Sequence, residues 1–339
     1  MKTVFHITSS NDFSGAEKIA MEIIKNTESV VKSCYICKPG PIEDFLKANG
    51  INYITYETVW DLLNIIKENH HDVLHCHDYT ASILGTLSLS GEMISHIHHN
   101  APFAKKLNIK SCLYLLSSIR YKKIVCVSEA ASREMFFYKL LKRKVETIYN
   151  WVNLEERRWD IEEARDIDLL FVGRLTEPKN PFLFIDIVSE LQKTKSGIKA
   201  VMLGDGDLRM DVENYISEKR VSNNIMLEGF NPTPHKFMKR AKLFLLTSNW
   251  EGFGLVILEA MLNGTIVVSR PIGGAKEIIS DGYNGFLCEN AESFVGIVNE
   301  VLNNSYNNES IISNALNSLE NFDMNKQIEK IKILYSRLG

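Results

Sequence analysis

Residues 251–259 read Glu-Gly-Phe-Gly-Leu-Val-Ile-Leu-Glu, a glycine-rich turn that leads into an apolar run ending at Ala260 and Met261. This run predicts a helix. The first turn of a helix presents backbone N–H groups that have no intrahelical partner, and such groups favour a diphosphate. Along a helix, the separation of Glu251 and Glu259 amounts to about 2.2 turns. We therefore expect Glu251 at the mouth of a ligand site and Glu259 deeper, on nearly the same face.

The whole chain has the composition of a globular protein large enough for two domains. It has 339 residues, of which 45% are hydrophobic and 24% are charged, both ordinary values. No run of about 18 apolar residues predicts a transmembrane helix, and the first apolar run is too short for a signal peptide. We expect a cytoplasmic protein. Although Cys34 and Cys37 stand at C-x-x-C spacing, we expect buried free thiols rather than a zinc or redox site.

Short apolar runs alternate with helical patterns along the chain, which predicts βα units and parallel sheets. One series of strands occupies the first half, and a second series begins at Asp168. The charged stretch 153–166 has no apolar periodicity, so we interpret it as the linker. The domains that we expect are an N-terminal domain over 1–152, a C-terminal domain over 153–322 and a final helix over 323–339.

Two cations follow the first strand of the second series. Gly-Arg-Leu at 173–175 ends that strand, and Lys179 comes five residues after Arg174. Fixed cations at a strand end that faces a helix N-terminus can neutralise a diphosphate, although solvated surface cations are the alternative. Ligands of doubly wound domains bind beyond the carboxyl ends of the strands. No G-x-G-x-x-G follows any predicted strand, so the dinucleotide-binding fingerprint is missing.

The segments around the glutamate pair closely resemble the retaining glycosyltransferases of the GT-B fold, in particular family 4 of the bacterial polysaccharide-assembly type. Residues 248–254 read Ser-Asn-Trp-Glu-Gly-Phe-Gly, and 259–261 read Glu-Ala-Met before Gly264. The resemblance covers nearly the whole chain and is strongest over 173–287. It implies two Rossmann-like, doubly wound parallel-sheet domains that face each other across a cleft. The N-terminal domain would bind the acceptor, the other would bind the nucleotide sugar, and the final helix would cross back to the N-terminal domain.

The resemblance also implies roles for individual residues. Glu259 would bind the ribose hydroxyls and Glu251 the donor sugar, while Arg174 and Lys179 would stabilise the leaving diphosphate. The backbone amides that would assist them belong to Phe253, Gly254 and Leu255. Further donor contacts would come from turns at strand ends, at Gly15, Gly173, Gly204, Asp205, Gly252, Gly273 and Gly274. For the turn at 204–205 the alternative is a simple βα turn in which Asp207 caps the following helix.

Three histidines, His96, His98 and His99, end the fifth predicted strand. The family has a histidine at this strand end, and the apolar residue Ile97 before it selects His98 as the catalytic candidate, with His99 second. Zinc is the alternative for such a cluster, but the transferases that this chain resembles work without metal. We therefore expect no metal and no cofactor. A segment that resembles the family's His-x-His-Asp pattern, and that we expect to shape the cleft, is His75, His77 and Asp78.

Residues 105–144 form a basic segment with eleven Lys or Arg and only two acids, Glu129 and Glu134. Apolar side chains are interleaved with the charges. Such a surface suits an anionic membrane, where each basic residue contributes about 1 kcal/mol, and a solvated helix face is the alternative. Because no nucleic-acid motif accompanies the charge, we expect no nucleic-acid partner. The membrane alternative implies a peripheral location on the inner face of the cell membrane.

The resemblance implies a hexosyltransferase-type enzyme that moves a sugar from a nucleotide-diphosphate donor to a hydroxyl of a glycan or lipid-linked saccharide, in cell-surface polysaccharide synthesis. A UDP-sugar is the favoured donor and GDP-mannose the second. We expect same-face attack assisted by the departing phosphate, rather than a double displacement through a carboxylate. The alternatives are a nucleotide-sugar epimerase of the same fold, which would not carry the glutamate pair, and a non-catalytic membrane-associated partner subunit, which would tend to lose charged site residues.

Overall fold

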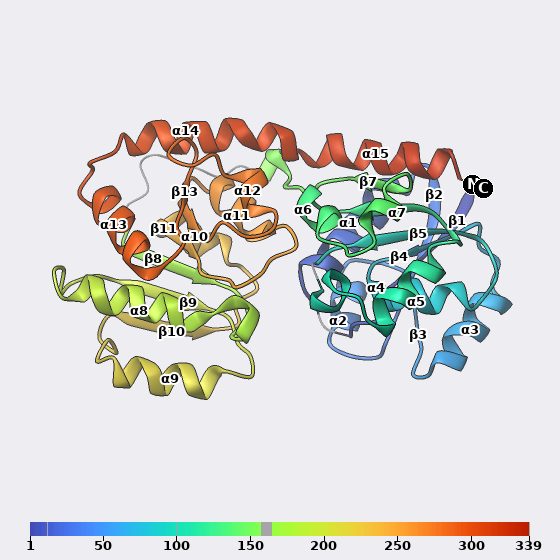
Figure 1. Ribbon diagram of the computed structural model, residues 1–339, viewed down its shortest axis with the longest axis horizontal. Helices are drawn as coiled ribbons and strands as arrows, with labels where there is room; N and C mark the ends of the chain where they lie inside the picture. Colours follow the sequence, from blue (N-terminus) through green and yellow to red (C-terminus); the bar gives the residue numbers. More distant parts are fainter. Residues whose placement is uncertain (12, 100, 157–164, 339) are drawn as a thin grey trace. The chain divides into compact units, whose positions relative to one another are not determined.

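A computed structural model describes residues 1–11, 13–99, 101–156 and 165–338, which form two compact α/β units (Figure 1). The first unit comprises Met1–Asn150 and the chain from Met324 onward, and the second comprises Trp151–Asp323. Each unit is built on one parallel sheet, so the predicted α/β class with two Rossmann-like sheets is confirmed. Most of the stretch that we interpret as a linker, 157–164, lies outside the described residues.

The first unit contains a seven-stranded parallel sheet in the order β3-β2-β1-β4-β5-β6-β7. Its strands are β1 (Lys2–Ile7), β2 (Val31–Cys37), β3 (Tyr53–Thr55), β4 (Val73–Cys76), β5 (Glu92–Ile97), β6 (Tyr121–Cys126) and β7 (Val145–Thr147). The chain extends the sheet to one side of β1 and then returns to the other side through β4. In open α/β sheets, ligands bind at the carboxyl ends of the strands where the order reverses in this way. For this sheet the switch point is the β1–β4 pair.

Helices connect the strands of the first unit. They are α1 (Gly15–Thr27), α2 (Ile42–Ala48), α3 (Val59–Glu68), α4 (Tyr79–Thr86), α5 (Ile109–Ser117), α6 (Glu129–Arg133), α7 (Tyr138–Leu141) and the terminal α15 (Met324–Ser336), with a short 3-10 turn η1 (Pro102–Lys105) before α5. Ile328, Ile331 and Leu334 of α15 are buried, as the apolar face of this helix requires. The ammonium group of Lys2 donates to the carbonyl of Tyr335 at 3.1 Å, which ties α15 to the start of β1.

The cysteines are free thiols. Cys34 and Cys37 lie in β2, where burial raises the pKa of the Cys34 thiol to about 11 and that of Cys37 to about 12. Neither is a reactive thiolate at neutral pH. Cys37 is buried as expected, but Cys34 is only partly buried, so the expectation of buried thiols is wrong for Cys34. Cys112 on α5 is exposed.

The second unit contains a six-stranded sheet in the order β10-β9-β8-β11-β12-β13. Its strands are β8 (Ile167–Val172), β9 (Ala200–Leu203), β10 (Ile225–Gly229), β11 (Ala241–Leu246), β12 (Ile266–Ser269) and β13 (Phe286–Leu287). Its helices are α8 (Pro181–Gln192), α9 (Arg209–Glu218), α10 (His235–Arg240), α11 (Leu255–Leu262), α12 (Ala275–Ile278), α13 (Ala291–Leu302) and α14 (Asn308–Ser318). Strands β8, β9, β11 and β12 consist mainly of buried apolar residues, as a sheet covered on both faces requires, whereas the edge strand β10 exposes Met226 and Glu228. The strand order reverses between β8 and β11, so this pair is the switch point of the second sheet.

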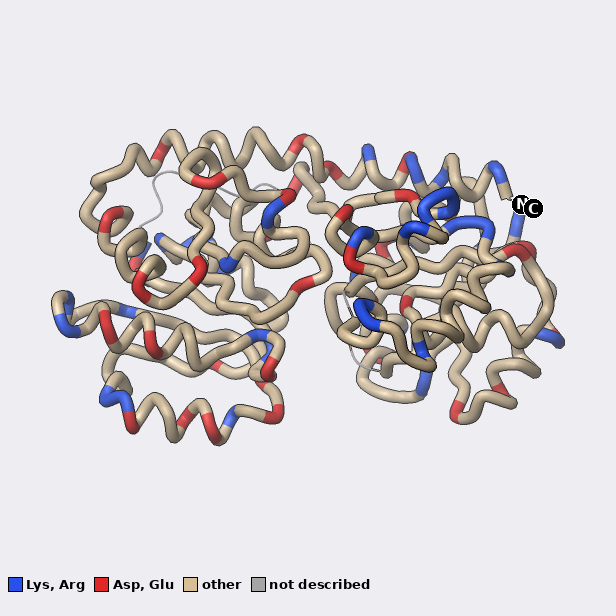
Figure 2. The backbone as a smooth tube through the Cα atoms, viewed as in Figure 1, with Lys and Arg blue, Asp and Glu red and all other residues tan. Residues whose placement is uncertain are grey.

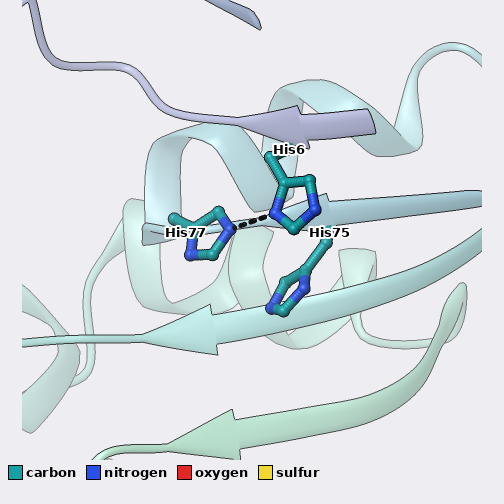
Figure 3. A group of neighbouring side chains, drawn as sticks. All are labelled: His6, His75 and His77. Atoms are coloured by element: carbon teal, nitrogen blue, oxygen red, sulfur yellow. Dashed lines mark hydrogen bonds between the residues drawn. The ribbon is translucent and has the colours of Figure 1, made fainter. Parts of the chain in front are cut away.

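A row of buried histidines crosses the β1–β4–β5 region of the first sheet. Alternate residues of a strand point to the same face, so the rings of His75 and His77 stack with centroids 4.3 Å apart, and those of His96 and His98 stack at 4.1 Å. His6 from β1 lies beside the first pair and bonds to His77 (Figure 3). Burial lowers the pKa of all five imidazoles, that of His6 to about 3. The row is therefore neutral at physiological pH.

We predict that the protein loses stability as the pH falls below about 6.5, the ordinary pKa of histidine. Above that pH the five imidazoles are neutral in both the folded and the unfolded chain, so they contribute no pH dependence. Below it the unfolded chain binds protons that the folded chain excludes, which costs about 1.4 kcal/mol per pH unit for each histidine. For His6 the loss continues down to its folded-state pKa of about 3.

The midpoint of thermal unfolding, followed by circular dichroism from about pH 8 to about pH 5, measures this effect. His6→Leu should make the midpoint less sensitive to pH. The matched control is His70→Gln, at an imidazole that is 83% exposed, which should leave the sensitivity unchanged. A His6→Leu variant as acid-sensitive as the unmodified protein would show that His6 does not contribute to the effect.

Candidate functional site

An ion pair joins the two loops that leave the switch point of the second sheet. Lys179 ends a short 3-10 turn, η3 (Glu177–Lys179), after β8, and Glu251 follows β11. The ammonium nitrogen of Lys179 lies 2.5 Å from Glu251 Oε1, and the two side chains are only 24% and 11% exposed. Ser248 Oγ donates to the same oxygen at 2.8 Å. Among the described residues, Oε2 of Glu251 accepts no hydrogen bond, so this oxygen is available to a ligand.

Polar side chains that sequence analysis did not single out hold the two loops together. Thr247 Oγ1 donates to the carbonyls of Lys179 at 3.2 Å and Asn180 at 3.0 Å. The backbone N–H of Asn249 donates to Pro178 O at 2.7 Å, and its side-chain amide donates to Glu177 O at 3.0 Å. The backbone of Lys179 is thus fixed against the β11 loop. The sequence does carry one signal for this arrangement, because Asn180-Pro181 is a helix N-cap followed by proline at the first helical position.

Glycines allow the turn after β9 to pack directly on the turn after β8. Gly204 has φ +139°, and a Cβ there would lie 1.9 Å from the carbonyl oxygen of Gly173. The N–H of Leu175 donates to Asp205 O at 2.9 Å, which closes the contact. Asp205 is bound by its own turn, since its Oδ1 accepts from the N–H of Gly206 at 2.8 Å. The alternative in which Asp207 caps α9 is wrong, because Leu208 is the N-cap residue and no side-chain cap is present.

The turn after β12 supports the backbone of the glutamate loop. A Cβ on Gly273, which has φ +47°, would lie 2.0 Å from the carbonyl oxygen of Glu251. A Cβ on Gly274 would lie 2.6 Å from the carbonyl oxygen of Phe253. Both glycines are therefore required by close backbone contact. Gly252 and the ring of Phe253 are buried, and that ring packs against Phe322 at a centroid distance of 5.6 Å.

The structure corrects the predicted geometry of the glutamate pair. Helix α11 begins at Leu255, after Gly254 with φ +93°, so Glu251 lies before the helix and does not share a helical face with Glu259. The buried ring of Phe253 and the left-handed backbone of Gly254 prevent the helix from starting earlier. Glu259 lies in the second turn of α11 and is half-buried. The amides of Gly254 and Leu255 precede the first hydrogen bond of α11, from Ile257 N to Gly254 O, and their role toward a diphosphate stays a prediction.

Arg174 differs from Lys179 in its surroundings. It directly follows Gly173 beyond the end of β8 and is exposed. Within the described part of the chain its guanidinium group forms no ion pair. Arg174 is therefore available to an anionic ligand at the carboxyl end of the sheet. Lys179, by contrast, is already paired with Glu251.

Gly15 and His98 belong to the first unit, whereas the other predicted site residues belong to the second. Gly15 is the first residue of α1, directly after the N-cap Ser14. His98 comes directly after β5 and is 7% exposed, while its alternative His99 is exposed. Burial next to His96 lowers the pKa of His98, so its imidazole is neutral.

Two groups of ring nitrogens in the histidine row are close enough to be considered as metal ligands. They are His6, His75 and His77, and His77, His96 and His98, with ligand atoms within 4.8 Å of one another. His99, which sequence analysis placed in a potential zinc cluster with His96 and His98, is in neither group. Both groups consist of neutral imidazoles without a carboxylate, a donor set that suits zinc, copper or nickel better than magnesium or calcium.

Known proteins align with this chain over most of its length. The chain is 25% identical to the Escherichia coli UDP-Gal:alpha-D-GlcNAc-diphosphoundecaprenol alpha-1,3-galactosyltransferase, over 98% of this chain and 96% of that protein. It is 25% identical to the Staphylococcus aureus capsular polysaccharide biosynthesis glycosyltransferase CapH, over 82% of this chain and 84% of that protein. Anabaena Alr3699/HepE, solved in complex with UDP and glucose, aligns over 100% of both chains with a TM-score of 0.89 at 19% identity, a likeness of fold.

Two family models match adjoining parts of the chain. Residues 37–156 match the model described as Glycosyltransferase Family 4, and residues 154–318 match the model described as Glycosyl transferases group 1. Together they cover the first sheet from β3 onward, the whole second sheet and the loops that hold Lys179 and Glu251. The chain belongs to the family-4 glycosyltransferases of the GT-B fold.

Proposed function

We propose that this glycosyltransferase moves a sugar, with retention at the anomeric carbon, from a UDP-sugar to a hydroxyl of a glycan or lipid-linked saccharide in cell-surface polysaccharide synthesis. The observation that carries the proposal is the Lys179–Glu251 pair at the switch point of the second sheet, beside the exposed Arg174. The names of the relatives favour this donor and acceptor, since one is named for UDP-Gal and a diphosphoundecaprenol-linked sugar. GDP-mannose is the second candidate donor.

The proposed reaction exchanges one glycosidic bond for another. The bond from the anomeric carbon to the diphosphate oxygen breaks, the acceptor oxygen attacks from the same face, and its proton passes to the departing phosphate. The protein's main task is to stabilise the negative charge that develops on the diphosphate. Arg174, Lys179 and the amides at the start of α11 supply this, and removing one such preorganised donor costs about 3–4 kcal/mol.

The ion pair would have a second task. A lysine ammonium group has three donors, so Lys179 can keep its bond to Glu251 while it donates to a phosphate oxygen. This bond, with the one from Ser248, fixes the carboxylate of Glu251. The remaining oxygen Oε2 can then accept a hydrogen bond from a hydroxyl of the donor sugar. Glu259 would bind the ribose from the second turn of α11.

We predict that Arg174→Ala and Lys179→Ala each lower kcat/KM by a factor of about 10² to 10³, because 3–4 kcal/mol of transition-state stabilisation is lost. Arg174→Ala is the cleaner test, since Arg174 is exposed. Lys179→Ala also leaves the partly buried carboxylate of Glu251 unpaired, which destabilises the folded state. The measurement is nucleotide release from a panel of UDP-sugars and GDP-mannose, with circular dichroism to confirm folding.

The matched control is Lys199→Ala, which removes an exposed cation just before the start of β9, at the opposite end of the sheet. It should release nucleotide at the unmodified rate. Near-normal turnover in both site variants would refute the assigned roles. Interconversion of nucleotide sugars without any acceptor would instead identify an epimerase.

We predict that transfer needs no divalent metal, because two cationic side chains and the helix amides neutralise the diphosphate. An excess of EDTA should leave the initial rate unchanged, and added Mg²⁺ or Mn²⁺ should not raise it. Activity that disappears with EDTA and returns with Mn²⁺ would assign part of the diphosphate charge to a metal.

We further propose that the enzyme works at an anionic membrane surface, as a lipid-linked acceptor requires. No helix among the described residues is both long and apolar enough to cross a bilayer. The candidate contact is the basic segment 105–144. Helix α5 turns its buried side, with Ser111 and Tyr114, toward the core of the first unit. Its opposite side exposes an apolar stripe at i, i+4 and i+7, namely Ile109, Leu113 and Leu116.

Basic residues accompany this stripe. Residues of α5 and α7, including Tyr114 and Leu141, line the same small apolar pocket, so the two helices are neighbours. Exposed Lys139, Lys142 and Arg143 lie on and just after α7, where Lys and Arg gather in Figure 2. The two acids of the segment are already paired, Glu129 with Arg133 at 2.5 Å and Glu134 with Lys105 at 2.6 Å. The segment therefore combines exposed apolar side chains with excess positive charge, which favours an anionic lipid surface.

We predict that the protein sediments with vesicles of phosphatidylglycerol and phosphatidylcholine but not with vesicles of phosphatidylcholine alone, and that salt weakens the binding. The triple variant Ile109→Ser, Leu113→Ser, Leu116→Ser should lose binding, since the apolar contact is removed. Trp60→Ser, at a side chain that is 76% exposed on α3, is the control and should bind normally. Failure of the unmodified protein to sediment with anionic vesicles would exclude this surface.

A further inference from the structure

Two chains of hydrogen bonds run through the histidine row at the β1–β4 switch point. In the first, His6 Nδ1 lies 3.0 Å from His77 Nε2, and His77 Nδ1 lies 3.1 Å from His98 Nε2. In the second, the Tyr335 hydroxyl lies 2.6 Å from His75 Nδ1, and His75 Nε2 lies 3.1 Å from His96 Nδ1. The chains stack on each other through the rings but exchange no hydrogen bond.

At each end of the first chain, one ring nitrogen takes no part in its hydrogen bonds. Among the described residues, neither His6 Nε2 nor His98 Nδ1 has a hydrogen-bond partner, although both atoms are buried. His77, in the middle, uses both of its nitrogens. A neutral imidazole has one donor and one acceptor nitrogen, so the three rings must share a single direction of donation. Only two arrangements of protons are possible.

In one arrangement His6 donates to His77, His77 donates to His98, and His98 keeps a free Nδ1–H. In the other arrangement every bond is reversed, and the free N–H is at Nε2 of His6. A buried N–H without an acceptor is rarer and more costly than an acceptor without a donor. His6 is 0% exposed inside strand β1, whereas His98 is 7% exposed and follows the carboxyl end of β5. Because Nδ1 of His98 and Nε2 of His6 are both buried, it is the position of His98 after the carboxyl end of β5 that favours the free N–H there, where a ligand of the first unit would lie and could accept from it.

We propose that His6 and His77 are positioning residues, which hold His98 as its Nδ1–H tautomer and so present a hydrogen-bond donor to an oxygen atom of the substrate. This inference rests on the proposed transferase function in one respect, because that function identifies the substrate. An isolated imidazole side chain prefers the Nε2–H tautomer, so the chain of bonds imposes the less common form. His98 then accepts at Nε2 from His77 and keeps a buried, unpartnered Nδ1–H for the substrate oxygen.

A bound transition metal is the competing use of these imidazoles. A divalent ion at either histidine group would place two positive charges among buried neutral rings, with no carboxylate in the group, and such burial of charge is costly. Nitrogen atoms that share a proton at 3.0 Å point at each other along the bond, whereas ligands of a tetrahedral ion point at a common centre. The observed geometry therefore fits hydrogen bonds better than coordination.

The tautomer of His98 can be measured directly by two-dimensional ¹H–¹⁵N NMR of the imidazole rings in ¹⁵N-labelled, untagged protein. We expect a protonated Nδ1 and an unprotonated Nε2 in the unmodified protein. His77→Leu should return His98 to the Nε2–H form. The matched control is His96→Leu, which removes an equally buried imidazole that stacks on His98 at 4.1 Å but lies in the other chain; it should leave the tautomer unchanged.

Kinetics separate the hydrogen bond from packing. His6→Leu should lower kcat about tenfold, the effect of one lost hydrogen bond of about 1.4 kcal/mol, with KM for the nucleotide sugar little changed. His6→Asn keeps an amide near the position of Nδ1 and should recover most of the rate. The His6→Leu and His6→Asn variants also test the proposal if His77→Leu fails to fold. Equal losses in both His6 variants would assign His6 to packing alone.

Three further outcomes are decisive. An Nε2–H tautomer at His98 in the unmodified protein would overturn the proposal, as would one equivalent of zinc retained by the purified protein and lost in His77→Leu. The expected tautomers in a protein that releases no nucleotide from any donor would support the positioning role and overturn the proposed function instead. The two inferences therefore fail separately.

Discussion

The ion pair between Lys179 and Glu251 is the interaction on which the proposed site depends. It joins the loops that leave β8 and β11, at the point where the strand order of the second sheet reverses. Breaking a buried pair by removing one partner costs about 3–5 kcal/mol, because the remaining charge is left uncompensated. The surrounding glycines and Thr247 hold both loops in place, so the charges are set before any ligand arrives, which electrostatic catalysis requires.

The side chains at the switch points of the two sheets differ in charge. At the β8–β11 pair, the cations Arg174 and Lys179 suit an anionic leaving group, and Glu251 is the anionic partner that holds Lys179. At the β1–β4 pair, His6 and His77 are buried and neutral, because burial lowers their pKa. Neutral imidazoles can orient a hydrogen-bond donor without adding charge. The two sheets share a strand order, and on the proposed function the second would stabilise a diphosphate while the first would position a neutral group.

The sequence predicts the sheets well and the site in part. Strands of a parallel sheet are continuous apolar runs, so β8 and β11 are recognisable without knowledge of their neighbours. The start of α11 was predicted too early, because the burial of Phe253 against Phe322 depends on a contact distant in sequence. Thr247 and Asn249 were missed for the same reason, since their partners lie in the β8 loop. The periodicity of α5 also could not show that its apolar stripe faces outward.

A crystal structure of the protein with bound UDP would locate the diphosphate relative to the Lys179–Glu251 ion pair. We expect phosphate oxygens within hydrogen-bond distance of the Arg174 guanidinium group, the Lys179 ammonium group and the amides at the start of α11, with the ribose at Glu259. A diphosphate bound away from the carboxyl ends of β8 and β11, with the Lys179–Glu251 pair out of contact, would contradict this expectation.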